Sequence, residues 1–251
     1  MERGTRPIAI LAVVGGLTLA IASPAPAARR CLGERATIVG TPESDVIRAS
    51  ARDDVIVAGR DEDLIRGRGG HDRVCTGRGY DTILAGGGND RVRGGPGQDV
   101  LYADPGDDRL DGGHGDFDAV LFDRAPRGIR LDLAEGVASG FGADRLTRIE
   151  NSAGSPYGDV LRGDRRQNFL HGRLGPDVIL GFRGWDFLIG DGGPDRLKGG
   201  TGADFLLGDR NDDLLDGGEG GEDGVGDEGD GGAHQGGDRC VNLENQRNCE
   251  F

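Results

Sequence analysis

The chain has 251 residues, and 50 of them are glycine, about a fifth of the sequence where an ordinary globular domain has roughly 7%. The 30 Lys and Arg against 44 Asp and Glu give a formal net charge of −14. This balance argues against a nucleic-acid partner, which would require a basic stripe, and it favours a cation as the natural partner.

The N-terminus has the layout of a secretory signal peptide. Arg3 and Arg6 precede an apolar run over residues 8–22, and Ala25-Pro26-Ala27 supplies small residues for cleavage. The run is shorter than the roughly 20 residues that span a bilayer. We therefore expect residues 1–27 to be removed and the mature chain to be secreted, with no membrane span. An uncleaved N-terminal anchor is the alternative.

Four cysteines in an exported chain favour disulfides. Cys31 and Cys75 bracket the first repeats, while Cys240 and Cys249 flank a short terminal segment. Local pairing therefore predicts the bonds Cys31–Cys75 and Cys240–Cys249, one of three connectivities open to four cysteines. A metal-thiolate site is the alternative, which the lack of any CxxC motif disfavours.

Aspartate recurs every nine residues through two long stretches, and an aliphatic residue follows each one two positions later. The first series consists of Asp45, Asp54, Asp63, Asp72, Asp81, Asp90, Asp99 and Asp108. The second consists of Asp159, Asp177, Asp186, Asp195, Asp204 and Asp213, with Asn168 in the remaining position. A carboxylate and a core residue that recur together at a constant nine-residue interval indicate a repeat architecture.

The best copies of the repeat read GGPGQDVLY at residues 94–102 and GGTGADFLL at residues 199–207. The first six residues must turn tightly, which requires the positive φ that glycine adopts without strain. The last three form a short strand whose central aliphatic residue points to the core. The pattern resembles the GGxGxDxUx nonapeptide of the RTX, or hemolysin-type, calcium-binding repeat proteins, where U is a large aliphatic residue.

The resemblance implies an all-β fold, a right-handed parallel β-roll (a β-solenoid) with 18 residues per turn. Asp72 would then stack over Asp90, and Asp81 over Asp99, at the strand spacing of about 4.8 Å. Such columns of like charge need a counter-ion. Calcium takes six to eight oxygen ligands, so the resemblance implies several Ca²⁺ ions between loops, each contributing to folding. A solenoid that stacks without metal is the alternative, but it leaves the carboxylates uncompensated.

The quality of each copy predicts which loops bind calcium best. Loops that end at Asp54 (ASARDD) and Asp63 (AGRDED) have lost the family's glycines, and Asn168 replaces a charged ligand by a neutral one. The expected strong ligands are Asp72, Asp81, Asp90, Asp99, Asp108, Asp177, Asp186, Asp195, Asp204 and Asp213. The expected weaker ligands are Asp45, Asp54, Asp63 and Asp159.

The repeat pattern divides the mature chain into four segments. Residues 28–118 form an N-terminal cap and the first β-roll block, and residues 153–216 form the second block. Between them, residues 119–152 lose the nonamer and alternate apolar with polar residues, a strand pattern. We expect this connector to pack on the roll. Residues 217–251 read as degenerate repeat and a disulfide-stapled cap, or alternatively as an acidic flexible tail.

One outward position of the second block carries three phenylalanines, each 18 residues apart: Phe169, Phe187 and Phe205. They are expected to stack as a column on an exposed face. Because contiguous apolar patches often mark interaction sites, the column is a candidate docking surface for a cell-envelope component, a protein partner or a second copy. Burial under the connector or the C-terminal segment is the alternative.

Sequence motifs of common hydrolases are missing. The chain has no HExxH of a zinc protease and no GxSxG nucleophile elbow, so we expect no enzyme activity. The sequence predicts a secreted calcium-binding protein that folds on binding Ca²⁺. An extracellular adhesion protein that uses the calcium-stiffened roll as a scaffold is the alternative, and a secreted hydrolase is a distant third.

Overall fold

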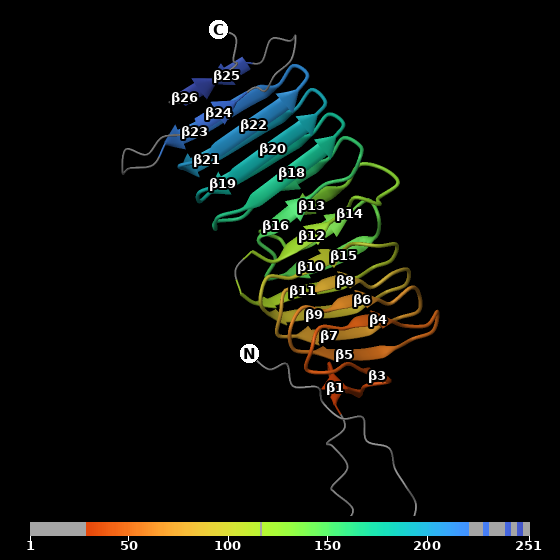
Figure 1. Cartoon of the computed structure of the whole chain (residues 1–251). Coiled ribbons are helices and arrows are strands. Elements are labelled where there is room, and N and C mark those ends of the chain that lie inside the picture. The colour runs from red at the N-terminus through yellow and green to blue at the C-terminus, as the bar shows by residue number, and fades with distance from the viewer. Residues whose placement is uncertain (1–28, 116, 221–227, 231–238, 242–244, 248–251) are drawn as a thin grey trace, which may run out of the picture.

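The computed structural model describes residues 29–115, 117–220, 228–230, 239–241 and 245–247. The expected signal peptide and much of the expected C-terminal cap lie outside these residues. The described strands form two long sheets that stack along one axis, from the red N-terminal turns to the blue C-terminal turns (Figure 1). No helix occurs within this part of the chain.

The first sheet has 13 described strands. In spatial order they are β3 (Ile38–Val39), β5 (Val55–Gly59), β7 (Arg73–Gly77), β9 (Arg91–Pro96), β11 (Arg109–His114), β15 (Ala143–Thr147), β14 (Val137–Ser139), β13 (Arg130–Asp132), β17 (Val160–Arg162), β19 (Val178–Arg183), β21 (Arg196–Gly202), β23 (Leu214–Gly220) and β25 (Arg239–Val241).

The second sheet has 11 described strands. In spatial order they are β4 (Val46–Arg48), β6 (Leu64–Arg66), β8 (Thr82–Leu84), β10 (Val100–Tyr102), β12 (Ala119–Leu121), β16 (Asn151–Ala153), β18 (Phe169–Leu174), β20 (Phe187–Gly192), β22 (Phe205–Arg210), β24 (Glu228–Asp230) and β26 (Asn245–Arg247). A separate antiparallel pair, β1 (Arg30–Cys31) and β2 (Glu34–Arg35), precedes the roll.

The register of the strands confirms a parallel β-solenoid with 18 residues per turn. Leu101 pairs with Ile83 in the second sheet, and Ile179 pairs with Leu197 in the first. Successive repeats therefore alternate between the two sheets, so each Asp-rich loop lies where the chain crosses from one sheet to the other. The aliphatic residue of each repeat points between the sheets, and Leu101, Ile179 and Leu188 are at most 1% exposed.

The connector lies within the roll, where its strands continue both sheets. Its ends, β12 and β16, continue the second sheet as parallel neighbours. In the first sheet, β13, β14 and β15 form an antiparallel insertion between β11 and β17. The two repeat blocks are thereby joined into one continuous roll.

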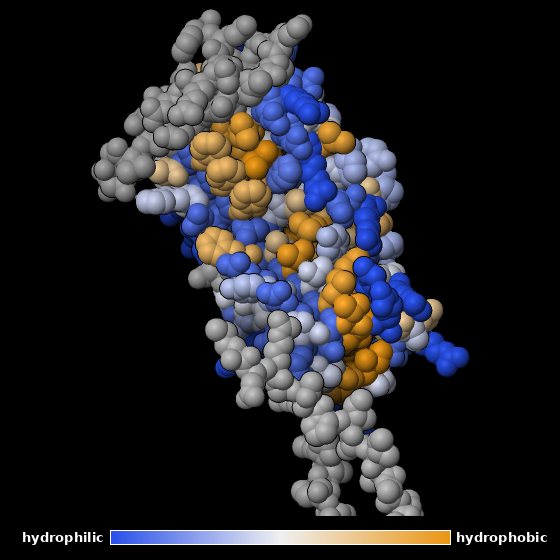
Figure 2. All heavy atoms as spheres, in the orientation of Figure 1, coloured by the Kyte–Doolittle hydropathy of each residue, from blue (hydrophilic) through white to orange (hydrophobic). Residues whose placement is uncertain are grey.

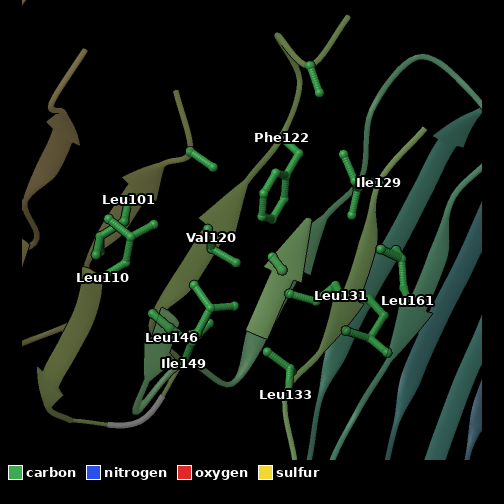
Figure 3. Packing of buried hydrophobic residues seen from close by; sticks show 14 of the residues in the cluster. Leu101, Leu110, Val120, Phe122, Ile129, Leu131, Leu133, Leu146, Ile149 and Leu161 are labelled. Carbon is green, nitrogen blue, oxygen red and sulfur yellow. The ribbon is translucent and has the colours of Figure 1, made fainter. Parts of the chain in front are cut away.

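Alternating apolar residues explain why the connector enters the sheets. Ile129, Leu131 and Leu133 face the interior and are at most 8% exposed, and the fully buried ring of Phe122 fills the space beside them (Figure 3). A strand with one apolar face is stable only when that face is covered. The apolar face of this insertion therefore continues the core where the repeats stop.

The predicted disulfide Cys31–Cys75 is present and ties β1 to β7. Cys249 lies outside the described residues, so the second pairing stays a prediction. Among the described residues there is no helix with the length and apolar character needed to cross a membrane.

Candidate metal centres

The aspartates of the repeat form a hydrogen-bonded column along each edge of the roll. In each column the backbone N–H of one Asp donates to Oδ1 of the Asp one turn further on. Asp72 N lies 2.7 Å from Asp90 Oδ1, and Asp90 N lies 2.9 Å from Asp108 Oδ1. The same bond links Asp177 to Asp195 at 2.8 Å. The sheet register thus brings the predicted carboxylates together in two rows.

The two columns contain all fourteen predicted aspartates and Asn168. One column runs through Asp45, Asp63, Asp81, Asp99, Asp118, Glu150, Asn168, Asp186 and Asp204. The other runs through Asp54, Asp72, Asp90, Asp108 and Asp144, and then through Asp159, Asp177, Asp195 and Asp213.

Three column members were not among the predicted ligands: Asp118, Asp144 and Glu150. They carry the columns through the connector, where the nine-residue count is lost. Asp99 N donates to Asp118 Oδ1 at 2.8 Å, and Asp108 N donates to Asp144 Oδ1 at 3.0 Å. The available signal was an acidic residue two positions before a buried aliphatic one, as Asp118 precedes Val120 and Asp144 precedes Leu146.

The second carboxylate oxygen of nine column members is buried without a hydrogen-bond donor from any described residue. This holds for Oδ2 of Asp63, Asp72, Asp90, Asp99, Asp118, Asp144, Asp177, Asp186 and Asp195. Each of these residues is at most 3% exposed. A buried charged oxygen with no partner is strongly unfavourable, so these atoms require a cation or a proton.

The first glycine of each loop allows a carboxylate oxygen and a backbone carbonyl oxygen to approach closely. A Cβ at Gly94 would lie 2.1 Å from Asp99 Oδ2 and 2.4 Å from the carbonyl oxygen of Gly112. A Cβ at Gly181 would similarly lie 2.3 Å from Asp186 Oδ2. A carboxylate oxygen and a carbonyl oxygen therefore converge on one space, which glycine leaves open. Such hard oxygen donors are the ligands that calcium prefers.

Burial raises the pKa of these carboxyl groups, and neighbouring carboxylates raise it further. Desolvation brings the pKa of Asp72, Asp99 and Asp186 to about 7. The pKa of Asp108 and of Asp177 reaches about 8, again through burial first and repulsion from the adjacent column members second. The raised pKa values indicate that the protein itself does not compensate negative charge in the columns, which is the condition for binding a cation.

In a second class of loop, the carboxylate accepts hydrogen bonds from a residue of the same loop. Ser50 donates to Asp54 Oδ2 from its backbone N–H at 3.0 Å and from its hydroxyl at 2.7 Å. Ser155 donates to Asp159 in the same way, at 2.6 Å from N–H and 2.7 Å from the hydroxyl. The pKa of Asp54 is accordingly lowered, since these hydrogen bonds outweigh its desolvation. These loops have little need of a metal.

The backbone at the second loop position separates the two classes. In the loops whose Asp Oδ2 has no hydrogen-bond donor, the residue at the second position has positive φ. This holds even where that residue is not glycine, as at Arg68 (φ 80°) and Phe182 (φ 77°). Non-glycine residues reach this region only with strain. Ser50 and Ser155 are not among the residues with positive φ, and their N–H groups donate to the carboxylate. A Ser or Thr four residues before the Asp was the sequence signal for this class.

At Asn168 the column is neutralised by the protein. Arg166 Nη1 lies 2.6 Å from Glu150 Oε1 and its Nη2 lies 3.1 Å from Asp164 Oδ2. The Asn168 side chain accepts from Asp164 N and donates to the Glu150 carbonyl oxygen, both at 2.8 Å. A guanidinium and an amide here take the places of a metal ion and a charged ligand.

No group of three or more His, Cys, Asp or Glu side chains converges in the manner of a side-chain metal cluster among the described residues. The edge loops differ from such clusters because their donors are one carboxylate per repeat and backbone carbonyl oxygens. The chemistry of the donor set therefore fits calcium, which accepts carbonyl ligands, and not zinc, which requires Cys or His.

The three phenylalanines stack as expected on the outer face of the second sheet. Ring centroids are 5.2 Å apart for Phe169 and Phe187 and 4.5 Å apart for Phe187 and Phe205, with nearly parallel planes. Phe169 is 41% exposed. Figure 2 shows hydrophobic side chains gathered on the part of the surface where Figure 1 places β18, β20 and β22.

Comparison with known protein families agrees with this arrangement. The family described as RTX calcium-binding nonapeptide repeat (4 copies) matches residues 37–61, 48–83, 84–116, 154–181, 162–197 and 189–221. These segments cover most of both repeat blocks and omit the connector. No curated protein matches the chain.

Proposed function

Since the chain belongs to the RTX calcium-binding nonapeptide repeat family, we propose that it is a secreted protein whose β-roll folds on binding several Ca²⁺ ions along both edges. The observation that carries this proposal is the row of buried Oδ2 atoms without hydrogen-bond donors. Bound calcium supplies the positive charge that these carboxylates need. The proposal is one of binding, not of catalysis.

The proposed ligands follow from the two classes of loop. We assign the main sites to Asp72, Asp81, Asp90, Asp99, Asp108, Asp177, Asp186, Asp195, Asp204 and Asp213, as the repeat pattern predicts. The bare oxygens of Asp63, Asp118 and Asp144 add these three residues to the assignment. The carboxylates of Asp54 and Asp159 accept hydrogen bonds from within their own loops, so we assign them weak calcium sites or none.

Calcium dependence gives secretion a physical role. Extracellular calcium modules bind with dissociation constants of about 10⁻⁴–10⁻³ M. A chain with such sites stays loosely folded where calcium is scarce and becomes ordered outside the cell. This reasoning supports export through the proposed signal peptide at residues 1–27.

Calcium titration followed by circular dichroism tests the proposal. We expect the mature chain at pH 8 to gain β signal as calcium is added and to lose it in chelator. A β signal that is already complete without calcium would refute folding on calcium binding.

Ion stoichiometry tests the assignment of the ligands. Replacing Asp90 and Asp99 together by Ala should lower the number of bound ions. Asp54→Ala serves as the matched control, because this carboxylate already has donors within its own loop. An unaltered stoichiometry in the double variant would show that the ions lie elsewhere.

The stacked phenylalanines favour a second candidate function, adhesion through the outer face of the second sheet. Phe187→Asp should abolish attachment to cells or self-association in calcium while leaving the roll folded. Val46→Asp is the control. Val46 is 56% exposed at the equivalent position of β4, and it lies outside the stack of three phenylalanines. Equal behaviour of the two variants would exclude the adhesion function.

A further inference from the structure

Three arginines form a row across adjacent strands of the first sheet. Arg91 on β9, Arg109 on β11 and Arg145 on β15 are direct partners in the parallel register. Neighbouring strands lie about 4.8 Å apart, so three like charges follow one another at that spacing. We call these residues the arginine row. Like charges directly opposite each other destabilise a sheet, so the row requires anions.

The described residues provide carboxylates to other arginines of this face but not to the row. Arg73, which precedes the row in the register, pairs with Glu34 at 3.0 Å. Arg93 and Arg148 both pair with Asp111. In contrast, the exposed side chains of Arg91, Arg109 and Arg145 form no ion pair with any described residue. Three unpaired guanidinium groups thus lie together on a chain whose net charge is −14.

The surface is hollowed along the row. All three arginines line a hollow on the loop side, together with Asn89 and the carboxylates of Asp90, Asp107 and Asp108. All three also line a second hollow over the strands, together with Thr147. A ligand can therefore lie across the strands and meet each guanidinium in turn.

The chemistry of the row identifies the class of ligand. A guanidinium group forms paired hydrogen bonds to carboxylate, sulfate or phosphate. The row is one residue wide, and Asp107 and Asp111 flank it. This arrangement fits a single linear chain with spaced anions and repels a densely charged nucleic acid. Asn89 and Thr147 add polar side chains suited to sugar hydroxyl groups.

We propose that the outer face of the first sheet binds an acidic polysaccharide, whose carboxylate or sulfate groups pair with Arg91, Arg109 and Arg145. The inference goes beyond calcium binding, because the arginine row lies on a sheet face and binds an anion. Asp90 and Asp108, which border the loop-side hollow, are among the calcium ligands of the proposed function. The inference needs only a folded roll. All binding measurements are therefore made in saturating calcium, with folding checked by circular dichroism.

The test compares two triple variants of equal charge. One is R91Q/R109Q/R145Q. The control is R130Q/R196Q/R239Q, whose arginines are exposed on the same sheet and have no arginine as strand partner. Binding is measured to heparin as the sulfated probe, to hyaluronate as the carboxylated probe, and to neutral dextran and single-stranded DNA.

The wild type and the control variant should bind heparin or hyaluronate, with an affinity that falls as salt is added. The row variant should bind at least about tenfold more weakly, since one hydrogen bond to a charged group is worth roughly that factor. Binding to only one of the two anionic probes would identify the anion. Equal binding by both variants, no binding of the wild type to either anionic probe, equal binding to dextran, or tighter binding to DNA would overturn the proposal.

Discussion

The metal-free roll should be more stable in mild acid than at pH 8. The buried column carboxyl groups have folded-state pKa values of about 7 to 8, against 3.8 for the unfolded groups. The folded state therefore binds more protons than the unfolded state between about pH 4 and pH 8. By linkage, the free energy of unfolding of the metal-free chain falls as the pH rises through this window.

The size of the effect decides whether the metal-free roll folds. A shift of about three pKa units corresponds to roughly 4 kcal/mol per group. Six groups reach a pKa of about 7 or more, namely Asp72, Asp99, Asp108, Asp177, Asp186 and Asp195. Even at half that value per group, their combined cost at pH 8 reaches the total stability of a typical domain, about 5–15 kcal/mol. Protonation of the folded groups at pH 5 removes the larger part of this cost, and the remainder is lost only below the unfolded pKa of 3.8.

The assay is far-ultraviolet circular dichroism of calcium-free protein from pH 8 to pH 5, with a parallel series in calcium. The β signal should rise on acidification without calcium and should be present at pH 8 with calcium. Calcium affinity should fall on acidification, because protons compete for the same carboxylates. If the calcium-free signal does not depend on pH, the columns do not control folding.

Three further predictions concern single features of the roll. Gly94→Ala should weaken calcium binding, because the new Cβ would lie in the space where a carboxylate and a carbonyl oxygen converge. Gly87→Ala should have little effect, because its nearest contact is at 3.9 Å; equal calcium affinities of these two variants would show that the two displaced oxygens are not calcium ligands. Replacing Cys31 and Cys75 by Ser should lower the free energy of unfolding by about 2–4 kcal/mol, because the disulfide closes a long loop and restricts the unfolded chain. Urea titrations in calcium would measure the loss. Arg166→Gln removes the guanidinium that pairs with the buried carboxylate of Glu150, so it should lower the free energy of unfolding in urea titrations by about 1–3 kcal/mol and raise the amount of calcium that this turn needs to fold; unaltered stability would refute self-neutralisation.

The repeat predicted most of the fold, because one nine-residue count determines strand position, register and the two carboxylate columns. It failed at the connector, where seven residues replace the six of a normal loop before Asp118, so the spacing from Asp108 becomes ten. Glycine count and loop geometry differ for Asp63, which the repeat pattern ranks among the weaker ligands. Its loop has lost most glycines but keeps Gly59 at the second position with positive φ, and its Oδ2 is bare. Local backbone conformation is not readable from glycine content alone.

Loops that satisfy their own carboxylates occur where each block begins. Asp54 lies in the first turns of the first block, and Asp159 and Asn168 open the second block. The second group adjoins the connector, whose apolar residues form a core that needs no ion. A solenoid turn is stabilised mainly by its neighbours, so a turn that folds without metal supplies an ordered surface for the next. We propose that calcium-dependent turns add from this surface as ions bind, so that folding starts at the breaks in the repeat.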